Sequence, residues 1–531
     1  MPTKQCLQCN KTFRITDQDL AFYEKINVPQ PTLCPDCRER RRLTWRNEMH
    51  FYERNCALCK QAIISIYSNN KPFPVYCARC YWSDKWNPLS FGQEYDFTQT
   101  FFSQLQSLQN RVSRLAIINR NSENSEYTNV CERNKNCYMI IESSNNENCL
   151  YCYWIQKSKD LVDCSFCSEC ELCYECDNCN ISYELHYSKN CTNCSQSKYL
   201  VNCSGVNNCL GCVNLVNKQY YILNQPYSPE DYQQYINNLD KDKFIKLFQE
   251  LVIKQPRKYA EISKSENCIG NYIINAHNCQ SAFHAHDSEN CRYAYHVWRQ
   301  AKDCLDVDTV GMQTELVYES TNTAINSYNC QFCARCWSVR DSQYCIDCDN
   351  AKNILGSISL IKAEYCILNK QYSRSDYQIM INKIKQDMIK NHEYGEFFPS
   401  NLSPFAYNET AAMLYYPLQS TEALMQQQNI NIAAKNNEPI CESCHKLFKY
   451  IKQEEVFYTN HAIALPKICF SCRLLHRLQQ RNPNHLWHRQ CMCTQPDHNH
   501  QGRCAEEFAT TYSPEQKELV YCEQCYQKEI Y

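Results

Sequence analysis

Glycine is scarce in this chain, with 8 among 531 residues. A backbone loop that cradles phosphate needs several glycines close together, and neither G-x-G-x-x-G nor G-x4-G-K-[ST] occurs. The metalloprotease pattern H-E-x-x-H is missing as well. We therefore expect a protein that is not an enzyme, although the sequence leaves this open. Turns that need positive φ must be made largely by asparagine, the next most tolerant residue, which is abundant.

Long apolar runs and an excess of charge are also missing. No stretch approaches the roughly 18 apolar residues of a membrane span, and the opening MPTKQC reaches a cysteine before a secretory leader would fit. We therefore expect a cytoplasmic protein with no membrane partner. The formal net charge is −2, so overall electrostatics attract neither nucleic acid nor a basic partner, and any such binding would be local.

Cysteine, in contrast, is plentiful, with 42 residues. In reducing cytosol, thiols at ligand spacing are more often metal ligands than disulfide partners. Three sets of paired C-x2-C knuckles each offer four thiolates to one tetrahedral ion, which leaves no open coordination position and predicts a structural ion. The predicted ligands are Cys6, Cys9, Cys34 and Cys37; Cys56, Cys59, Cys77 and Cys80; and Cys441, Cys444, Cys469 and Cys472.

The first and third sets are copies of one another. An offset of 435 superposes their cysteines and also Phe13 on Phe448, Phe22 on Phe457, Tyr23 on Tyr458, Pro31 on Pro466 and Arg38 on Arg473. The shared aromatic residues are expected to form the small apolar layer of each module.

A fourth set is predicted from Cys491, Cys493, Cys522 and Cys525, where the first pair is C-x-C. Cys504, His498 and His500 lie in the intervening loop and are alternative ligands, although a loop histidine is more often solvated. Together the sets predict about four zinc ions.

The stretch "CLQCNKTFRITDQDLAFYEKINVPQPTLCPDCRERRR" resembles the probable zinc-ribbon domain family of bacteria. A wider resemblance, over nearly the whole length, is to the large, functionally uncharacterised multi-zinc-ribbon proteins of candidate-phyla (Patescibacteria-type) bacteria. It is carried by "YCARCYWSDKWNPLSFGQEYDF", "SPFAYNETAAMLYYPL" and "TTYSPEQKELVYCEQCYQKEIY". The resemblance implies zinc binding at the four-cysteine sets and no established activity.

The middle of the chain is a repeat in which a polar residue precedes cysteine. Each pair follows the previous one after twelve or fifteen positions, in the series Asn136-Cys137, Asn148-Cys149, Asp163-Cys164, Asn178-Cys179, Asn190-Cys191 and Asn202-Cys203. This short period is typical of a parallel β-solenoid that stacks cysteine on cysteine. The segments "ILNQPYSPEDY" (222–232) and "ILNKQYSRSDY" (367–377) match at an offset of 145, so the solenoid is duplicated, and Ser228 and Ser373 each begin a capping helix.

The predicted fold is mainly β with small α parts, in which terminal zinc ribbons flank a duplicated Cys/Asn-rich β-solenoid with capping helices. A polar linker is expected over 426–437. The predicted domains are zinc ribbon 1 (1–50), zinc ribbon 2 with a trailing helix (51–118), solenoid copy 1 with its helix (119–258), solenoid copy 2 with its helix (259–395), a connector and linker (396–438), zinc ribbon 3 (439–488) and zinc site 4 (489–531).

The 25 cysteines of the middle region have three interpretations. They are buried thiols that pack as small apolar groups, extra zinc ligands, or iron–sulfur and redox groups. The closing x3-Cys-Pro of a ferredoxin run is missing, and the packing interpretation leads. The one polar constellation in the same region is His284, His286, His296, Asp306 and Asp308, either a metal or acid–base pocket or a solvated face.

Two local basic runs follow the copied modules: Arg38, Arg40, Arg41, Arg42 and Arg46, then Arg473, Arg477, Arg481 and Arg489. They predict phosphate contacts with nucleic acid, or else packing that offsets the net negative charge of a four-thiolate zinc centre. Our leading hypothesis is a non-enzymatic multi-zinc scaffold for a macromolecule, nucleic acid first. The alternatives are a pure protein-interaction scaffold, and a metal or redox protein or an enzyme that uses the His/Asp/Cys cluster of the solenoid.

Overall fold

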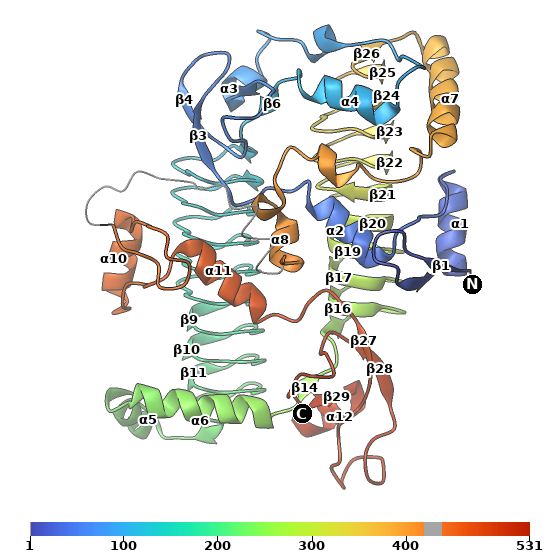
Figure 1. Ribbon diagram of the computed structural model, residues 1–531. Helices are drawn as coiled ribbons and strands as arrows, with labels where there is room; N and C mark the ends of the chain where they lie inside the picture. The colour runs from blue at the N-terminus through green and yellow to red at the C-terminus, as the bar shows by residue number, and fades with distance from the viewer. Residues whose placement is uncertain (1, 419–437, 531) are drawn as a thin grey trace. The chain divides into compact units, whose positions relative to one another are not determined.

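The computed structural model describes residues 2–418 and 438–530, so the linker predicted over 426–437 lies outside the described residues. The predicted fold class, mainly β with a duplicated solenoid between cysteine-rich ends, is confirmed (Figure 1). The described residues divide into unit 1 (2–117, 260–418 and 484–486) and unit 2 (118–259, 438–483 and 487–530). We number the cysteine-rich segments by their predicted ranges as module 1 (1–50) and module 2 (51–118), and as module 3 (439–488) and module 4 (489–531).

The solenoid of unit 2 is built from twelve-residue coils that pair in parallel, as Glu123 with Lys135 and Lys135 with Glu147. Three successive residues have three different roles in a coil. Val162 pairs with Tyr174 of the next coil, Asp163 turns the chain with φ 55°, and Cys164 points inward with none of its surface exposed. The fifteen-residue steps in the polar-Cys series therefore equal one twelve-residue coil plus three residues. The coils themselves keep the same length.

Asparagine makes many of the turns, as predicted. Asn178, Asn190 and Asn202 have φ between 53° and 54°, and their side-chain amides hydrogen-bond from coil to coil at 3.0 Å. Bulky residues also adopt this unfavourable conformation, among them Tyr151 with φ 56°. The bonds between coils hold it there, since the Tyr151 N–H donates to the carbonyl of Tyr138 at 3.0 Å.

Regular strands form where coils flatten. In the solenoid of unit 2 the strands of four residues are β9 (Tyr183–His186), β10 (Ser195–Lys198), β11 (Asn207–Leu210) and β12 (Gln219–Ile222). In the solenoid of unit 1 the strands of four or more residues are β16 (Ile269–Ile274), β17 (Gln280–His286), β19 (Arg292–Trp298), β20 (Ala301–Gly311), β21 (Glu315–Thr321), β22 (Tyr328–Gln331), β23 (Arg340–Gln343), β24 (Lys352–Leu355) and β25 (Glu364–Ile367). Both solenoids finish with an antiparallel partner, β13 (Gln225–Pro226) or β26 (Lys370–Gln371), which closes the last edge.

The two predicted helix starts are confirmed. Ser228 and Ser373 accept the N–H of the third residue that follows and begin α5 (Pro229–Asn237) and α7 (Arg374–Lys390). The run after Ser228 is divided, because Asp240 caps a second helix, α6 (Lys241–Lys254). Its Phe244 lies against Gly211, where a Cβ would come within 2.7 Å of the ring.

In unit 1 the corresponding glycine, Gly356, is covered by Phe101 of α4 (Phe101–Gln109), a helix of module 2. Helix α7 instead packs against β25, where Tyr377 contacts Tyr365, and runs along the flank of the yellow coils in Figure 1. Each solenoid end is therefore covered by an aromatic side chain from a helix, but by helices from different parts of the chain.

Candidate metal centres and their docking arginines

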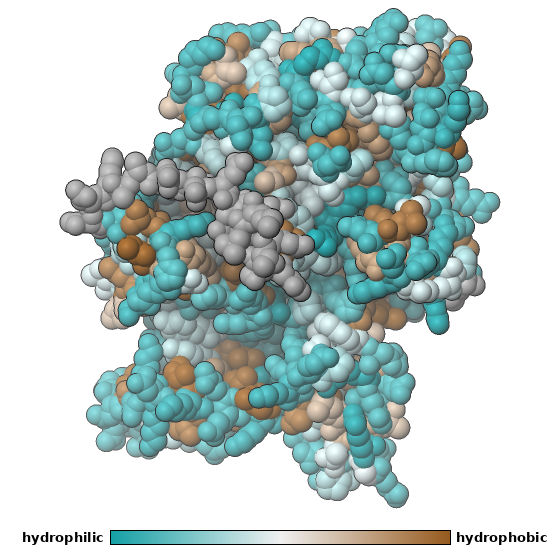
Figure 2. Space-filling view, viewed as in Figure 1, coloured by the Kyte–Doolittle hydropathy of each residue, from teal (hydrophilic) through white to brown (hydrophobic). Residues whose placement is uncertain are grey.

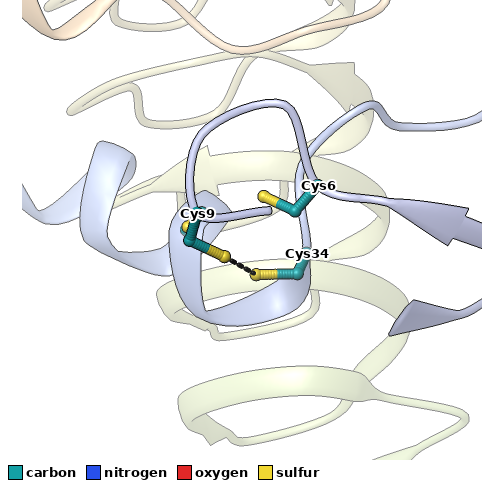
Figure 3. Close-up of side chains that lie close together, drawn as sticks. Cys6, Cys9 and Cys34 are labelled. Carbon is teal, nitrogen blue, oxygen red and sulfur yellow. Dashed lines mark hydrogen bonds between the residues drawn. The ribbon is translucent and has the colours of Figure 1, made fainter. Parts of the chain in front are cut away.

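The first three predicted cysteine sets each come together. In each set all four sulfur atoms lie within 4.8 Å of one another. In module 1, Cys6 and Cys9 lie between β1 (Thr3–Gln5) and β2 (Thr12–Arg14), and Cys34 caps α2 (Pro35–Leu43), which carries Cys37. Figure 3 shows Cys6, Cys9 and Cys34 gathered around one point, with the sulfurs of Cys9 and Cys34 3.7 Å apart.

Modules 2 and 3 repeat this construction. The second pair again begins a helix, α3 (Ala78–Tyr81) after Cys77 and α11 (Phe470–Gln479) after Cys469. The N–H groups of Cys77 and Cys469 donate to the sulfurs of Cys56 and Cys441, at 3.3 and 3.2 Å. Module 2 also contains β3 (Tyr52–Asn55), β4 (Ala62–Ser65), β5 (Val75–Tyr76), β6 (Arg114–Leu115) and the short helix η1 (Pro88–Phe91).

Backbone N–H groups favour the thiolate at one sulfur in each of these three sets. Burial opposes ionisation of Cys6, but hydrogen bonds from backbone N–H groups outweigh it and lower the pKa to about 6. The same balance lowers the pKa of Cys56 and of Cys441 to about 6. Burial raises the pKa of other members of the sets, as it does for Cys34 to about 11. Four convergent thiols fit a soft or borderline metal ion, and they leave no position for substrate.

Module 4 differs from the prediction in its grouping. Its elements are β27 (Trp487–Gln490), β28 (Glu507–Thr510), β29 (Val520–Tyr521) and α12 (Glu523–Ile530). The group of four sulfurs is made by Cys491, Cys504, Cys522 and Cys525. Cys504, an alternative ligand in the sequence, thus takes the place expected for Cys493. Cys493 lies instead beside His498 and His500.

The basic run of module 1 is buried against the solenoid of unit 1. Arg38 and Arg42, each 1% exposed, enter a pocket of carboxylates on β20 and β21. Arg38 Nη2 lies 2.9 Å from Asp306 Oδ2, and Arg42 Nε lies 2.7 Å from Asp308 Oδ2. Arg41 joins them, with its Nη2 2.6 Å from Glu319 Oε2.

Module 3 docks on the solenoid of unit 2 in the same way. Arg473 and Arg477, 4% and 7% exposed, both contact Asp163, at 2.8 and 3.1 Å. Arg481 pairs with Asp177 at 2.5 Å and lies over the ring of Phe166. The offset that relates the two cysteine sets also places these three arginines on Arg38, Arg42 and Arg46. The first two positions dock on solenoid carboxylates in both copies, whereas Arg46 pairs with Glu48 of its own module.

The other arginines of the two runs are also engaged. Arg40 donates to the Tyr407 hydroxyl at 3.0 Å, Arg46 pairs with Glu48, and Arg489 donates to the carbonyl of Ser513. Guanidinium groups buried in ion pairs do not reach phosphate without undocking. This geometry favours the packing interpretation, while nucleic-acid binding by Arg38, Arg40, Arg41, Arg42, Arg46, Arg473, Arg477 and Arg481 stays a prediction.

The sequence pattern did not single out Asp163 as a functional residue. It stands where its neighbours in the polar-Cys series, Asn148 and Asn178, are asparagine. A carboxylate at a buried corner is unfavourable unless it is paired. The exchange of Asn for Asp was therefore the available signal that a cation docks there.

The polar constellation of the solenoid is divided between two roles. His284 stacks between Tyr272 and His296, with ring centroids 4.6 and 4.9 Å away. Asp306 and Asp308 are the partners of Arg38 and Arg42. Burial lowers the pKa of His286. The side chains thus form an aromatic ladder and an ion-pair cluster, and none belongs to a metal-binding group of the described residues.

The mid-chain cysteines line the solenoid interior. All are buried except Cys268, which is half-buried, and their thiols donate to backbone carbonyls, as Cys167 does to Ser165 at 3.3 Å. Within the described chain, none joins a group that could hold a metal. This supports the interpretation as small apolar packing groups.

Replacing one interior thiol should cost little and release no metal. For Cys167→Ala we expect a loss of about 1 kcal/mol of stability, because one buried sulfur is removed. Zinc content per chain and the thermal midpoint are the measurements. Cys9→Ala, which removes a ligand of module 1, is the matched control and should lose one ion. Metal loss in Cys167→Ala would contradict the packing role.

A buried carboxyl in module 3 gives a pH dependence. Burial raises the pKa of Glu454, on α10 (Lys452–Asn460), from 4.5 to about 7, although Tyr151 and Arg473 lower it in part. The folded state therefore holds the proton more tightly than the unfolded chain. Its contribution to stability is complete below about pH 4.5 and is lost as the pH rises through 7.

The Glu454→Gln side chain is neutral at every pH. The stability of this variant relative to the wild type should therefore increase as the pH rises from 5 to 8. The expected relative gain is about 1–3 kcal/mol. Thermal unfolding of both proteins across this range measures it. A difference that does not change with pH would contradict the raised pKa.

Comparisons with known proteins add little to this geometry. No family model matches the chain, and no curated protein matches it. One solved structure that overlaps it is described as that of a "putative acetyltransferase" from Desulfovibrio desulfuricans G20, with 11% sequence identity, coverage of 52% of this chain and 82% of that chain, and a TM-score of 0.10. An overlap at that score carries no argument. The residues themselves define a β-solenoid protein with candidate four-cysteine metal centres.

Proposed function

We propose that this protein is a non-enzymatic scaffold whose modules are folded by structural zinc and clamped onto the solenoids by arginine. Thiolates in groups of four suit zinc, and closed sites of this kind stabilise folds instead of activating water. All described cysteines are free thiols, which fits a reducing, cytoplasmic location. A membrane-spanning helix needs a long apolar stretch, and no helix within residues 2–418 and 438–530 has one.

The proposal rests on one repeated observation: in two modules, cysteine ligands and docking arginines lie on the same helix. In modules 1 and 3 the helix that begins at the third cysteine ligand carries the arginines that enter the solenoid, Arg38 directly after Cys37 and Arg473 directly after Cys472. Metal binding orders this first helical turn. It therefore also positions the guanidinium for its buried carboxylate, so the metal sites act on the whole unit.

The protein-interaction alternative fits the surface better than nucleic acid does. The arginines of the basic runs are engaged within the protein, and the solenoid edges carry alternating charges, such as Lys157 with Glu169 and Lys352 with Glu364, both 2.9 Å apart. The face seen in Figure 2 is mostly hydrophilic. A mixed-charge surface gives no net attraction to phosphate.

Zinc analysis and filter binding test the two halves of the proposal. Purified full-length protein should contain zinc, and its binding to single- or double-stranded nucleic acid should be weak at low salt. Phosphate contacts through both arginine runs would instead give affinity that falls steeply between two salt concentrations. Such a slope, reduced by about one in Arg40→Ala, would favour nucleic acid as the partner. Metal-free protein with docked modules would reject the structural role of zinc.

A further inference from the structure

Module 4 contains a second set of ligand atoms beside the four sulfurs already described. Cys493, His498, His500 and Cys525 offer two sulfurs and two ring nitrogens, all within 4.8 Å of one another. Cys493 Sγ lies 3.1 Å from His498 Nδ1, and Cys525 Sγ lies 3.5 Å from His500 Nε2. Around a tetrahedral zinc ion, sulfur and nitrogen ligands are about 3.6 Å apart.

Each histidine has an acceptor near its other ring nitrogen. His500 Nδ1 is 2.9 Å from the carbonyl of Gly502, and His498 Nε2 is 3.6 Å from a carboxylate oxygen of Glu529 on α12. A metal-binding histidine commonly donates its second N–H to a carbonyl or carboxylate, which leaves the first nitrogen bare for the ion. In both rings the opposite nitrogen faces a cysteine sulfur, which is the orientation that a ligand needs.

The loop that carries the histidines is attached to the core of the module. The Lys528 ammonium on α12 donates to the carbonyl of Asp497, and the N–H of Cys504 donates to the carbonyl of Cys493 at 2.9 Å. His498 is 9% exposed and Cys493 is fully buried. The expectation that these loop histidines are merely solvated does not describe His498.

We propose that module 4 binds two zinc ions, the second held by Cys493, His498 and His500 and by the thiolate of Cys525, which bridges both ions. The proposal deepens the proposed zinc binding of this module, because Cys525 also belongs to the group with Cys491, Cys504 and Cys522. A four-thiolate ion alone has a formal charge of −2. Adding one divalent ion and the Cys493 thiolate changes the cluster to −1, so the second ion reduces the buried charge.

The experiment counts zinc in the full-length protein, loaded with zinc under anaerobic reducing conditions and desalted. The wild type should hold five ions, one for each ligand group. The double variant His498→Ala/His500→Ala should hold one fewer, while His498→Cys, which keeps a ligand, should hold the wild-type number. His488→Ala, whose side chain is 70% exposed on β27, is the matched histidine control and should lose none.

A bridging ligand and a ligand of one ion should differ in the number of zinc ions lost when each is replaced. Cys504→Ala should lose one ion and Cys525→Ala two. If a variant fails to fold, cadmium NMR of the wild type decides instead: two resonances coupled through a shared sulfur support the pair, and their absence overturns it. An unchanged zinc count in the double histidine variant also overturns it. Failure of the proposed function would appear elsewhere, as zinc missing from modules 1 to 3.

Discussion

Chelation of the full-length protein should make residues 2–50 and 439–483 sensitive to protease while the solenoid coils stay resistant. The shared aromatic residues of modules 1 and 3 contact the solenoids, as Phe22 contacts Tyr318 and Tyr458 contacts Tyr174. A structural zinc site contributes about 10–16 kcal/mol, as much as the stability of an ordinary domain. The solenoid interior has no such dependence, because its stacked cysteines and aliphatic residues are buried without metal. Limited proteolysis with mass mapping of the fragments, before and after zinc is added back, measures the effect.

Single-ligand variants assign the effect to one module at a time. Cys9→Ala should release only module 1, and the equivalent Cys444→Ala only module 3, because the two sets share no ligand. The solenoid variant Cys167→Ala should keep the wild-type fragment pattern. Termini that resist protease equally with and without metal would reject zinc-dependent folding.

The solenoid could be predicted because its signal is local and repeated. Each coil needs residues that tolerate positive φ and small residues that fit inside, and Asn-Cys supplies both in two consecutive positions, as at Asn190 and Cys191. The coil length was harder to predict from the sequence. The pair moves from one corner to the next between Asn148 and Asp163, so its longer spacing there conceals a constant twelve-residue coil.

The candidate sites were predictable only as far as ligand spacing reaches. C-x2-C pairs place two sulfurs on one knuckle, so the first three sets follow from sequence. Module 4 does not, because Cys493 and Cys504 are both near Cys491 in sequence and only the fold of the intervening loop decides which one joins it. The ion pairs of the arginines were out of reach for another reason, since Arg42 and Asp308 are 266 residues apart.

Both the modules and the solenoids are duplicated, and the two module–solenoid interfaces use the same kinds of contact. Arg38 lies over the ring of Tyr293 and Arg473 over that of Tyr151, and Tyr23 and Tyr458 make matching edge contacts with Tyr318 and Tyr174. The modules repeat at one offset along the chain, and their solenoid partners repeat at a much shorter one in the opposite order. The later module therefore docks on the earlier solenoid, and the earlier module on the later one. The matching arginine and tyrosine contacts, and not the order along the chain, determine which solenoid each module packs against.

Neutralising the carboxylate at either interface should release the module that docks there. In Asp306→Asn the Arg38 guanidinium keeps its charge but loses its buried partner at 2.9 Å, and Asp163→Asn does the same to Arg473. Removing one partner of a buried pair costs about 3–5 kcal/mol, because an uncompensated charge remains. Hydrogen exchange of the amides in α2 and α11 measures the loss for each module separately.

A surface pair between the same module and the same solenoid gives the matched control. Lys25 and Asp303 are 2.8 Å apart, but the lysine side chain is 52% exposed. Lys25→Ala should therefore cost no more than about 1 kcal/mol. Because module 1 and module 3 use the same chemistry, Asp306→Asn and Asp163→Asn should have similar effects, each confined to its own unit. If Asp306→Asn costs no more than Lys25→Ala, the buried arginines do not hold the modules in place, and the metal sites would stabilise the modules alone.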